Sequence, residues 1–404
     1  MRILTSLRGN KLIQNLILVG MVLVAVVSLL QGVKNAIAVS QDFQWDAARA
    51  LMERMDPYEL SLDQSVDITG SKLEEFYDLF ERDGIKQKME ANQFPSLLML
   101  LFPYALLSPF AARLAWIISN VFFTAGIIWL LRRTFLKELP HFDFAFLMLL
   151  MIIGTPYRNQ LGVGQHTLFS FFFFMLAVWL DEIKPEGNRI AIAVCMFISY
   201  FKYTLTAPLT LYLLYRKRFK EFAASVLGHM LLTVVAAVWM KKSPVYMIMA
   251  PLKVANALSA EGGLDLGAVF GGGVLSLVAG GIVALFLIFV TVKLPKGQEN
   301  LLISLLILWS LIITYHRTYD FFVLSVVVAA FIGSDVGFGK VINTDFMKIF
   351  YGIVLFAVYF VLRMFNENTL SRIGVGIIYY IFTIMISIIV VNLICGKQGI
   401  VNEG

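Results

Sequence analysis

Long apolar segments separated by short charged loops constrain this chain more than any other feature. Runs such as 12–39, 111–131, 222–240 and 274–292 are close to or above the roughly 20 residues that a helix needs to cross a bilayer. With 59% hydrophobic and only 15% charged residues, the chain carries more apolar surface than a soluble domain can bury. The sequence therefore predicts an all-α polytopic membrane protein.

Basic residues in the short loops predict how the helices are oriented. Arg2, Arg8 and Lys11 precede the first apolar run, which is too long for the apolar part of a signal peptide and lacks a small-residue cleavage site. We therefore expect an uncleaved first helix with a cytoplasmic N-terminus. The basic cluster at 216–220 is also expected in the cytoplasm. Alternating crossings place several stretches on the opposite side, with the loop after the first helix: 165, 202, the expected loop 241–273, 316 and 363–372.

Counting the crossings gives about 12 transmembrane helices, with a range of 11–13. The stretch that decides the count is 94–109, which is apolar but short and contains Pro95, Pro103 and Pro109. We expect a partial or re-entrant segment there instead of a full crossing. No fixed-period repeat and no low-complexity linker divides the chain, so one membrane domain over 1–404 is expected.

The longest polar stretch is the loop 40–93. Its segment 46–55 is amphipathic and 72–89 is a second charged helical candidate, so both are expected to lie along the outer membrane face. As the largest part of the chain outside the bilayer, this is the expected first extracytoplasmic loop and the catalytic loop. Its candidate side chains are Asp42, Asp46, Asp56 and Tyr58.

The expected topology gathers ionisable and polar side chains on one side of the membrane. Such groups cost free energy near a bilayer, so they mark candidate functional sites. A carboxylate can take the proton from an attacking hydroxyl, while Lys, Arg or His offsets the charge on a leaving phosphate. This combination favours transfer from a phosphate-bearing lipid. The set is Asp42, Asp46, Asp56, Gln165, His166, Lys202, His316, Arg317, Tyr319 and Asp320.

Each of these residues also has a structural interpretation. Asp42 is either a catalytic base or the N-cap of the amphipathic helix that begins near Trp45, since Asp is a favoured cap residue. Asp46 is expected to be a solvated helix residue, and Asp56 the start of an Asp-Pro-Tyr turn. Lys202 either contacts substrate or extends from a helix end to lipid headgroups.

The candidates in the later loops leave alternatives of the same kind. Gly164-Gln165 either forms a tight turn into a helix or offers a hydrogen-bonding amide to a sugar. His316 and Arg317 either face substrate or anchor the chain in an aromatic interface with Tyr319. Asp320 either caps its helix or pairs with Arg317.

Several enzyme classes lack their signatures in this sequence. The four histidines show no metal-ligand spacing and the acidic residues are loosely spaced, so no metal and no cofactor is expected. There is no Walker A motif, no dinucleotide fingerprint and no G-x-S-x-G elbow, so a sugar donor is expected to be lipid-linked. The net charge of +6 lies in short loops and indicates topology, not nucleic-acid binding. The alternative class is a polytopic lipid or solute transporter or flippase, although no paired inverted repeats are evident.

Several short motifs follow one another along the chain, namely Asp42-Phe43-Gln44-Trp45, Ala47-Ala48-Arg49-Ala50-Leu51, Asp56-Pro57-Tyr58, Phe94-Pro95-Ser96-Leu97, Gly164-Gln165-His166-Thr167-Leu168, Phe201-Lys202-Tyr203, Arg216-Lys217-Arg218 and Tyr319-Asp320. Their order resembles glycosyltransferase family 87, which comprises polyprenyl-phosphate-dependent GT-C enzymes. The family often has Pro-Pro at Pro95-Ser96 and Lys-Pro at Lys202-Tyr203, so this chain departs from it there.

The resemblance implies a GT-C-like helical bundle that transfers a hexose or pentose, with mannose as one candidate, from a polyprenyl-monophosphate donor. The acceptor would be a lipid or glycan of the cell envelope, and the transfer would invert the anomeric configuration. Asp42 would be the general base, with His316, Arg317 and Lys202 close to the donor phosphate. The expected location is a bacterial cytoplasmic membrane, with an extracytoplasmic active site. Further candidates for substrate contact are Gln165, Tyr319 and Asp320, then Asp46, Asp56, Tyr58 and His166.

Overall fold

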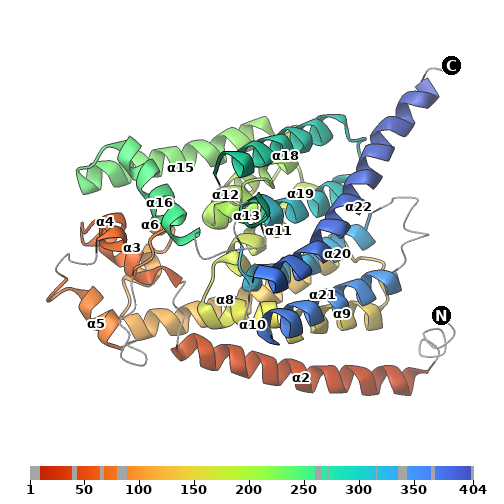
Figure 1. The fold of residues 1–404 in the computed structure, drawn as a ribbon, viewed down its shortest axis with the longest axis horizontal. Helices are drawn as coiled ribbons and strands as arrows, with labels where there is room; N and C mark the ends of the chain where they lie inside the picture. Colours follow the sequence, from red (N-terminus) through yellow and green to blue (C-terminus); the bar gives the residue numbers. More distant parts are fainter. Residues whose placement is uncertain are drawn as a thin grey trace. The chain divides into compact units, whose positions relative to one another are not determined.

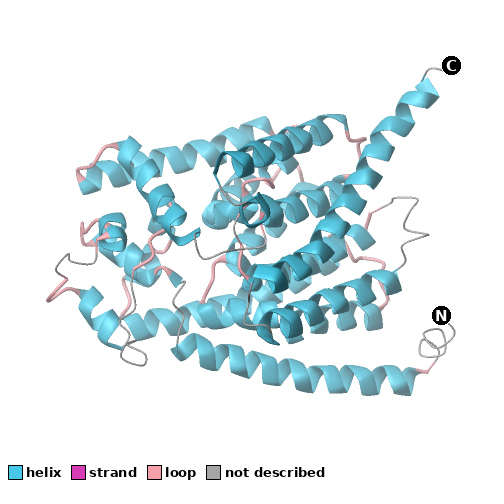
Figure 2. Ribbon diagram, in the orientation of Figure 1, coloured by secondary structure: helices cyan, strands magenta, loops and turns pink. Residues whose placement is uncertain are grey.

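The computed structural model describes residues 10–38, 43–63, 68–79, 89–259, 265–270, 273–314, 316–334, 344–364 and 369–401. Every regular element in these ranges is a helix (Figure 2), which confirms the all-α prediction for them. The chain divides into two compact units, which are described separately. Unit 1 comprises 1–33, 128–160 and 264–404, and unit 2 comprises 34–127 and 161–263.

Unit 1 has its core at α19 (Glu299–Ile313) and α20 (Leu324–Ile332), which pack against each other. Both helices are apolar on nearly all sides and buried along most of their length, as expected for helices enclosed by others. α21 (Thr344–Met364) contacts α20, and α22 (Thr369–Val401) contacts α19 and α21. The unit also contains α9 (His141–Ile153), α17 (Leu266–Phe270), α18 (Gly273–Lys293), η3 (Thr318–Val323) and most of α2 (Lys11–Ala38) and α10 (Thr155–Val163).

Unit 2 contains a helical hairpin of α11 (Thr167–Ile183) and α12 (Arg189–Ser199), with α15 (Phe219–Met240) packed on α12. The shorter elements are α3 (Trp45–Met52), α4 (Pro57–Leu62), α5 (Lys72–Leu79), α6 (Pro95–Leu100), α7 (Phe102–Ala105), η2 (Tyr200–Lys202), α13 (Tyr203–Thr206), α14 (Thr210–Tyr215) and α16 (Pro244–Ser259), with most of α8 (Pro109–Arg133). Of these, α3, α4, α6 and α16 gather beside α15 (Figure 1). This cluster contains α3 and α4 of the predicted catalytic loop, and α5 of the same loop contacts α3.

Six helices in the described residues are long and apolar enough to cross a membrane, so the chain is a membrane protein. A seventh span results if α10 and α11, which meet at a bend of 109°, form one broken crossing. The predicted count of about 12 is not confirmed, because α9, α16 and α19 have only 13, 16 and 15 residues. The six are Lys11–Ala38, Pro109–Arg133, Arg189–Thr206, Phe219–Met240, Gly273–Lys293 and Tyr379–Gly396.

Two proline-containing stretches, 94–109 and 241–273, contain short helices. Residues 94–109 contain α6 and α7, of six and four residues, before α8 begins. At roughly 1.5 Å per residue neither crosses a bilayer, which agrees with the expected partial segment. The expected loop 241–273 contains a helix that was not foreseen from the sequence, because α16 occupies 16 of its residues. Pro244 opens this helix, where its missing N–H is not needed, and Pro251 lies inside it.

Candidate active site

The predicted base, Asp42, lies outside the described residues, which resume at Phe43. α3 begins at Trp45 as predicted, and its N-cap residue is Gln44, which has a left-handed φ of 61°. The alternative in which Asp42 is the N-cap of this helix is therefore wrong. The Phe43 ring stacks on Trp116 with 4.8 Å between ring centroids. This contact attaches the start of α3 to α8 within unit 2.

Asp46 is buried, which corrects the prediction of a solvated helix residue. The residue is 6% exposed, and its carboxylate accepts hydrogen bonds from the Ala47 N–H at 2.9 Å and the Tyr77 hydroxyl at 2.8 Å. Burial raises the pKa of Asp46 to about 6, while these hydrogen bonds and the Arg113 charge limit the shift. Because Tyr77 belongs to α5, the contact joins two helices of the loop, and Asp46 has a structural role.

Asp56 begins the predicted Asp-Pro-Tyr turn and caps α4. Its Oδ1 accepts two backbone N–H groups of the first turn at 3.0 and 3.2 Å. Its Oδ2 accepts the Tyr246 hydroxyl at 2.7 Å and lies 3.3 Å from Lys242 Nζ. Tyr58 is fully buried and donates its hydroxyl to the Gln93 carbonyl at 2.9 Å. Both residues therefore hold the loop in place, since their polar atoms bind protein groups.

The turn between α10 and α11 carries the Gly164-Gln165-His166 motif. Gly164 has a φ of 74°, which favours glycine, and its carbonyl accepts Trp116 Nε1–H at 2.8 Å. The tight-turn interpretation is therefore confirmed. His166 is fully buried, and its Nε2 lies 2.9 Å from the Phe43 carbonyl oxygen. The turn thus contacts the residue that directly follows the predicted base.

Lys202 lies in η2, directly after α12, and is only 8% exposed. Its Nζ donates to Gln165 Oε1 at 2.9 Å, and its backbone N–H donates to Ser170 Oγ at 2.9 Å. The alternative in which Lys202 extends to lipid headgroups is wrong, because the ammonium group is buried against the turn before α11. The part played by Ser170 has no signal in the sequence, since it depends on a contact across the hairpin.

Several stretches expected on one side of the membrane meet in unit 2. The start of α3 contacts the turn before α11, that turn contacts η2, and α4 contacts α16. The end of α15 joins the same cluster, since Trp239 Nε1–H donates to the Leu51 carbonyl at 2.9 Å. This agrees with the predicted grouping of position 165, position 202 and the α16 part of 241–273 with the first loop. The side of the membrane on which they lie stays a prediction.

In unit 1, the predicted residues His316 and Asp320 form a buried pair. His316 Nδ1 lies 2.8 Å from Asp320 Oδ2, and Nε2 lies 3.2 Å from the Ser310 carbonyl. His316 is 2% exposed, so the prediction of an interfacial anchor is wrong for this residue. Arg317 is exposed and Tyr319 is half-buried. The imidazole is therefore held on both sides, and it is a partner of Asp320 in addition to the predicted alternatives of Arg317 or a helix cap.

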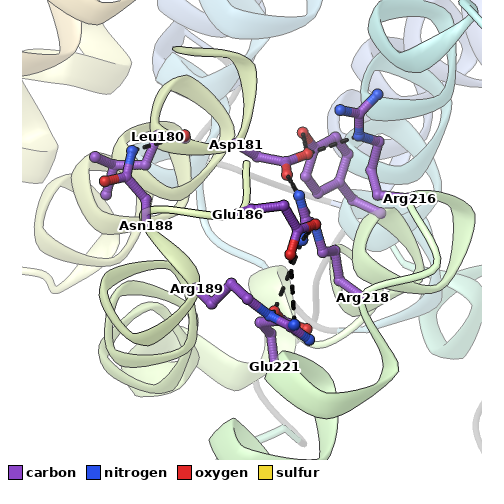
Figure 3. Close-up of polar contacts among 9 residues, drawn as sticks. Leu180, Asp181, Glu186, Asn188, Arg189, Arg216, Arg218 and Glu221 are labelled. Carbon is purple, nitrogen blue, oxygen red and sulfur yellow. Dashed lines mark hydrogen bonds and ion pairs between the residues drawn. The ribbon is translucent and has the colours of Figure 1, made fainter. Parts of the chain in front are cut away.

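The other end of the α11–α12 hairpin carries an ion-pair network (Figure 3). Asp181 is fully buried and lies 2.6 Å from Arg216 Nε and 2.9 Å from Arg218 Nη2. Arg189 Nε lies 2.6 Å from Glu221 Oε1. The basic cluster at 216–220 was expected only to mark topology, but its two arginines bind carboxylates. Acidic residues flank the loop between α11 and α12 and the loop between α14 and α15, and they were the sequence signal that could have revealed this network.

Comparison with known proteins adds to this geometry. The model of Glycosyltransferase family 87 matches residues 95–314, more than half of the chain. The chain belongs to glycosyltransferase family 87. This confirms the predicted family, and membership supports sugar transfer as the activity. No curated protein and no solved structure matches the chain.

The family 87 match covers one part of the candidate set. Gln165, His166 and Lys202 lie within the matched residues, whereas the loop residues 42–58 and the stretch 316–320 lie outside them. Within the described ranges, no group of three or more His, Cys, Asp or Glu residues is placed to hold a metal ion. The turn before α11 and η2 therefore form the candidate site that lies both within the family match and within one unit.

Proposed function

We propose that this family 87 protein is a GT-C-type membrane glycosyltransferase that uses a polyprenyl-monophosphate sugar. The acceptor is a lipid or glycan of the cell envelope, and mannose is one candidate sugar. The observation that carries the proposal is the family match over 95–314. The helices long enough to cross a membrane support a lipid-linked donor, because such a donor is anchored in the bilayer. The proposed location is a bacterial cytoplasmic membrane, with the active site on its outer side.

The proposed reaction is a single displacement at the anomeric carbon. An acceptor hydroxyl attacks this carbon while the Asp42 carboxylate takes the hydroxyl proton. The bond between the carbon and the phosphate oxygen breaks, and polyprenyl phosphate leaves with the negative charge. Attack on the face opposite the leaving phosphate inverts the anomeric configuration. A cation near the phosphate lowers the barrier, because negative charge develops there in the transition state.

Lys202 is the proposed cation in unit 2. Its ammonium group is buried and oriented by Gln165, and the same turn binds the backbone of Phe43, the residue after Asp42. Burial favours this role, since charges attract more strongly away from bulk water. His316 and Arg317 are proposed donor contacts in unit 1, with Asp320 orienting the His316 ring through Nδ1.

The test is transfer by the purified full-length protein. Synthetic prenyl-monophosphate sugars are supplied with extracted envelope lipids, and products are identified by mass spectrometry. Asp42→Asn is expected to lower kcat by ~10²–10⁴-fold, which is the usual contribution of a general base. Asp63→Asn is the control, because Asp63 is an exposed carboxylate of the same loop. Unchanged turnover in Asp42→Asn would reject the base, and no product from any prenyl-phosphate sugar would reject the donor class.

A further inference from the structure

A groove formed by the C-terminal ends of α3 and α15 together with α6 and α7 shares no lining residue with the candidate site. Its volume is about 530 Å³, and its walls are largely apolar. α15 is one of the candidate membrane spans, and Val238 and Trp239 near its end are 74% and 44% exposed. Arg54 and Lys241 complete the lining. The groove thus combines an apolar, lipid-accessible wall with two cations.

Neither of these cations has a carboxylate partner among the residues that the structure describes. The Arg54 guanidinium lies 4.1 Å from the centre of the Trp239 ring, which is a cation–π contact. The next lysine along the chain behaves differently, since Lys242 Nζ lies 3.3 Å from Asp56 and 3.5 Å from Glu59. Of two adjacent lysines, one is therefore neutralised by carboxylates and the other lines the groove.

Both cations also occupy left-handed backbone positions just after a helix ends. The φ angle is 61° at Arg54 and 53° at Lys241, where Gly or Asn is the residue of lowest conformational cost. The Lys241 N–H bonds to the Ala237 and Val238 carbonyls, so the backbone itself closes the end of α15. Closing the helix end does not require a long basic side chain.

We infer that this groove binds an anionic membrane lipid, whose phosphate contacts Arg54 and Lys241 and whose hydrocarbon chain lies against α15. Charge complementarity selects this occupant, because an uncharged lipid would supply no anion to Arg54 and Lys241. A tryptophan and two cations at the end of a membrane span are also where a lipid phosphate is expected. The bond from Trp239 Nε1–H to the Leu51 carbonyl holds α3 against α15, so the walls are preformed. The inference goes beyond the proposed sugar transfer and does not depend on it.

The test is native mass spectrometry of the purified full-length protein with dioleoyl phosphatidylglycerol, and with dioleoylglycerol as the uncharged probe. We expect the wild type to retain phosphatidylglycerol in preference to dioleoylglycerol. Arg54→Asn and Lys241→Asn should each weaken this binding about five-fold, which corresponds to ~1 kcal/mol per cation, and the double variant about 25-fold. Asn tolerates the left-handed conformation, so the variants should fold. Arg54→Gly with Lys241→Gly provides a second pair that removes the charges while suiting the backbone.

Lys217→Asn is the matched control. Lys217 has a φ of 58° after the end of α14 and is exposed, but it does not line the groove. This variant should bind phosphatidylglycerol as the wild type does. Wild-type binding by both double variants, or equal retention of the charged and uncharged lipids, would overturn the inference and leave the cations with a role only at the helix ends. Displacement by millimolar inorganic phosphate would also overturn it, because the site would then bind free anions.

Discussion

The two ends of the α11–α12 hairpin use similar polar side chains in opposite ways. At the Asp181 end, arginines lie within 2.6–2.9 Å of carboxylates in a network that joins two loops (Figure 3). At the other end, the acceptors are neutral: Gln165 Oε1 orients Lys202, and the Phe43 carbonyl orients His166. Pairing opposite charges stabilises the first end, whereas neutral acceptors position a cation and an imidazole at the second. The hairpin therefore has one structural end and one candidate catalytic end.

The largest expected effect is on stability at the network end. Asp181→Ala removes the buried carboxylate that binds Arg216, Arg218 and the Tyr212 hydroxyl, so these groups lose one shared acceptor. We expect the free energy of unfolding to fall by about 3–5 kcal/mol, measured by denaturant unfolding in detergent. Glu182→Ala, an exposed neighbour, is the control. A variant as stable as the wild type would show that this end is not a structural clamp.

The next effect concerns activity at the other end. Lys202→Gln should lower kcat/KM for the donor by about 10²-fold, because it removes the cation proposed to face the leaving phosphate. Its effect on unfolding should be smaller than that of Asp181→Ala. Lys184→Gln, which changes an exposed lysine beyond the far end of α11, should leave transfer unchanged. If both lysine variants transfer at the wild-type rate, Lys202 does not contact the donor phosphate.

Asp46 is a buried carboxylate held by hydrogen bonds, whereas Asp181 is held by ion pairs with two arginines. We therefore expect the ionisation of Asp46 to make the stability of the protein depend on pH. Burial raises the pKa of Asp46 in the folded state to about 6, from 3.8 in the unfolded state, so the folded protein binds the proton more tightly. This contribution to stability is fully present below about pH 4 and is lost as the pH rises through 6. Between pH 5 and 7 the loss is about 1 kcal/mol.

Thermal unfolding of the wild type and Asp46→Asn across this pH range tests the prediction. The other titratable groups are common to both proteins, so the difference between the two curves isolates Asp46. The wild type should lose stability relative to the variant as the pH rises. Parallel curves would mean that the carboxylate ionises as an exposed one does.

The smallest expected effect is at the rim of the network. The Glu186 side chain is 76% exposed and lies 3.1 Å from Arg218 and 3.4 Å from Arg189. Because exposed ion pairs contribute little, Glu186→Gln should change the unfolding midpoint by little more than the experimental error. A loss as large as that from Asp181→Ala would show that the network stabilises the loops as one cooperative unit.

The long helices could be predicted from the apolar runs of the sequence, whereas the polar contacts could not. The structure confirms helices at the predicted runs 12–39, 111–131, 222–240 and 274–292 as α2, α8, α15 and α18. This works because a chain in lipid must satisfy its backbone hydrogen bonds within each segment, so a local run of apolar residues is enough to specify a helix. The apolar residues of 241–273 were obscured by its prolines and glycines, which is why α16 was missed.

The candidate site was predicted as a set of residues but not as a set of contacts. Asp46 and Tyr77 are 31 residues apart, and Gln165 and Lys202 are 37 residues apart. No local pattern reports that such pairs will meet. Asp42, which depends most on the family resemblance, lies outside the described residues and stays a prediction.

Hydropathy was sufficient to establish a helical membrane protein, and the order of short motifs was sufficient to identify glycosyltransferase family 87. The assembled fold was needed to show that Asp46 is buried, that Lys202 binds Gln165 and that His316 binds Asp320. The physical reason is that burying apolar surface depends mainly on residue type, which can be read along the chain. The role of a charged or hydrogen-bonding group depends instead on the acceptors and donors that surround it in space.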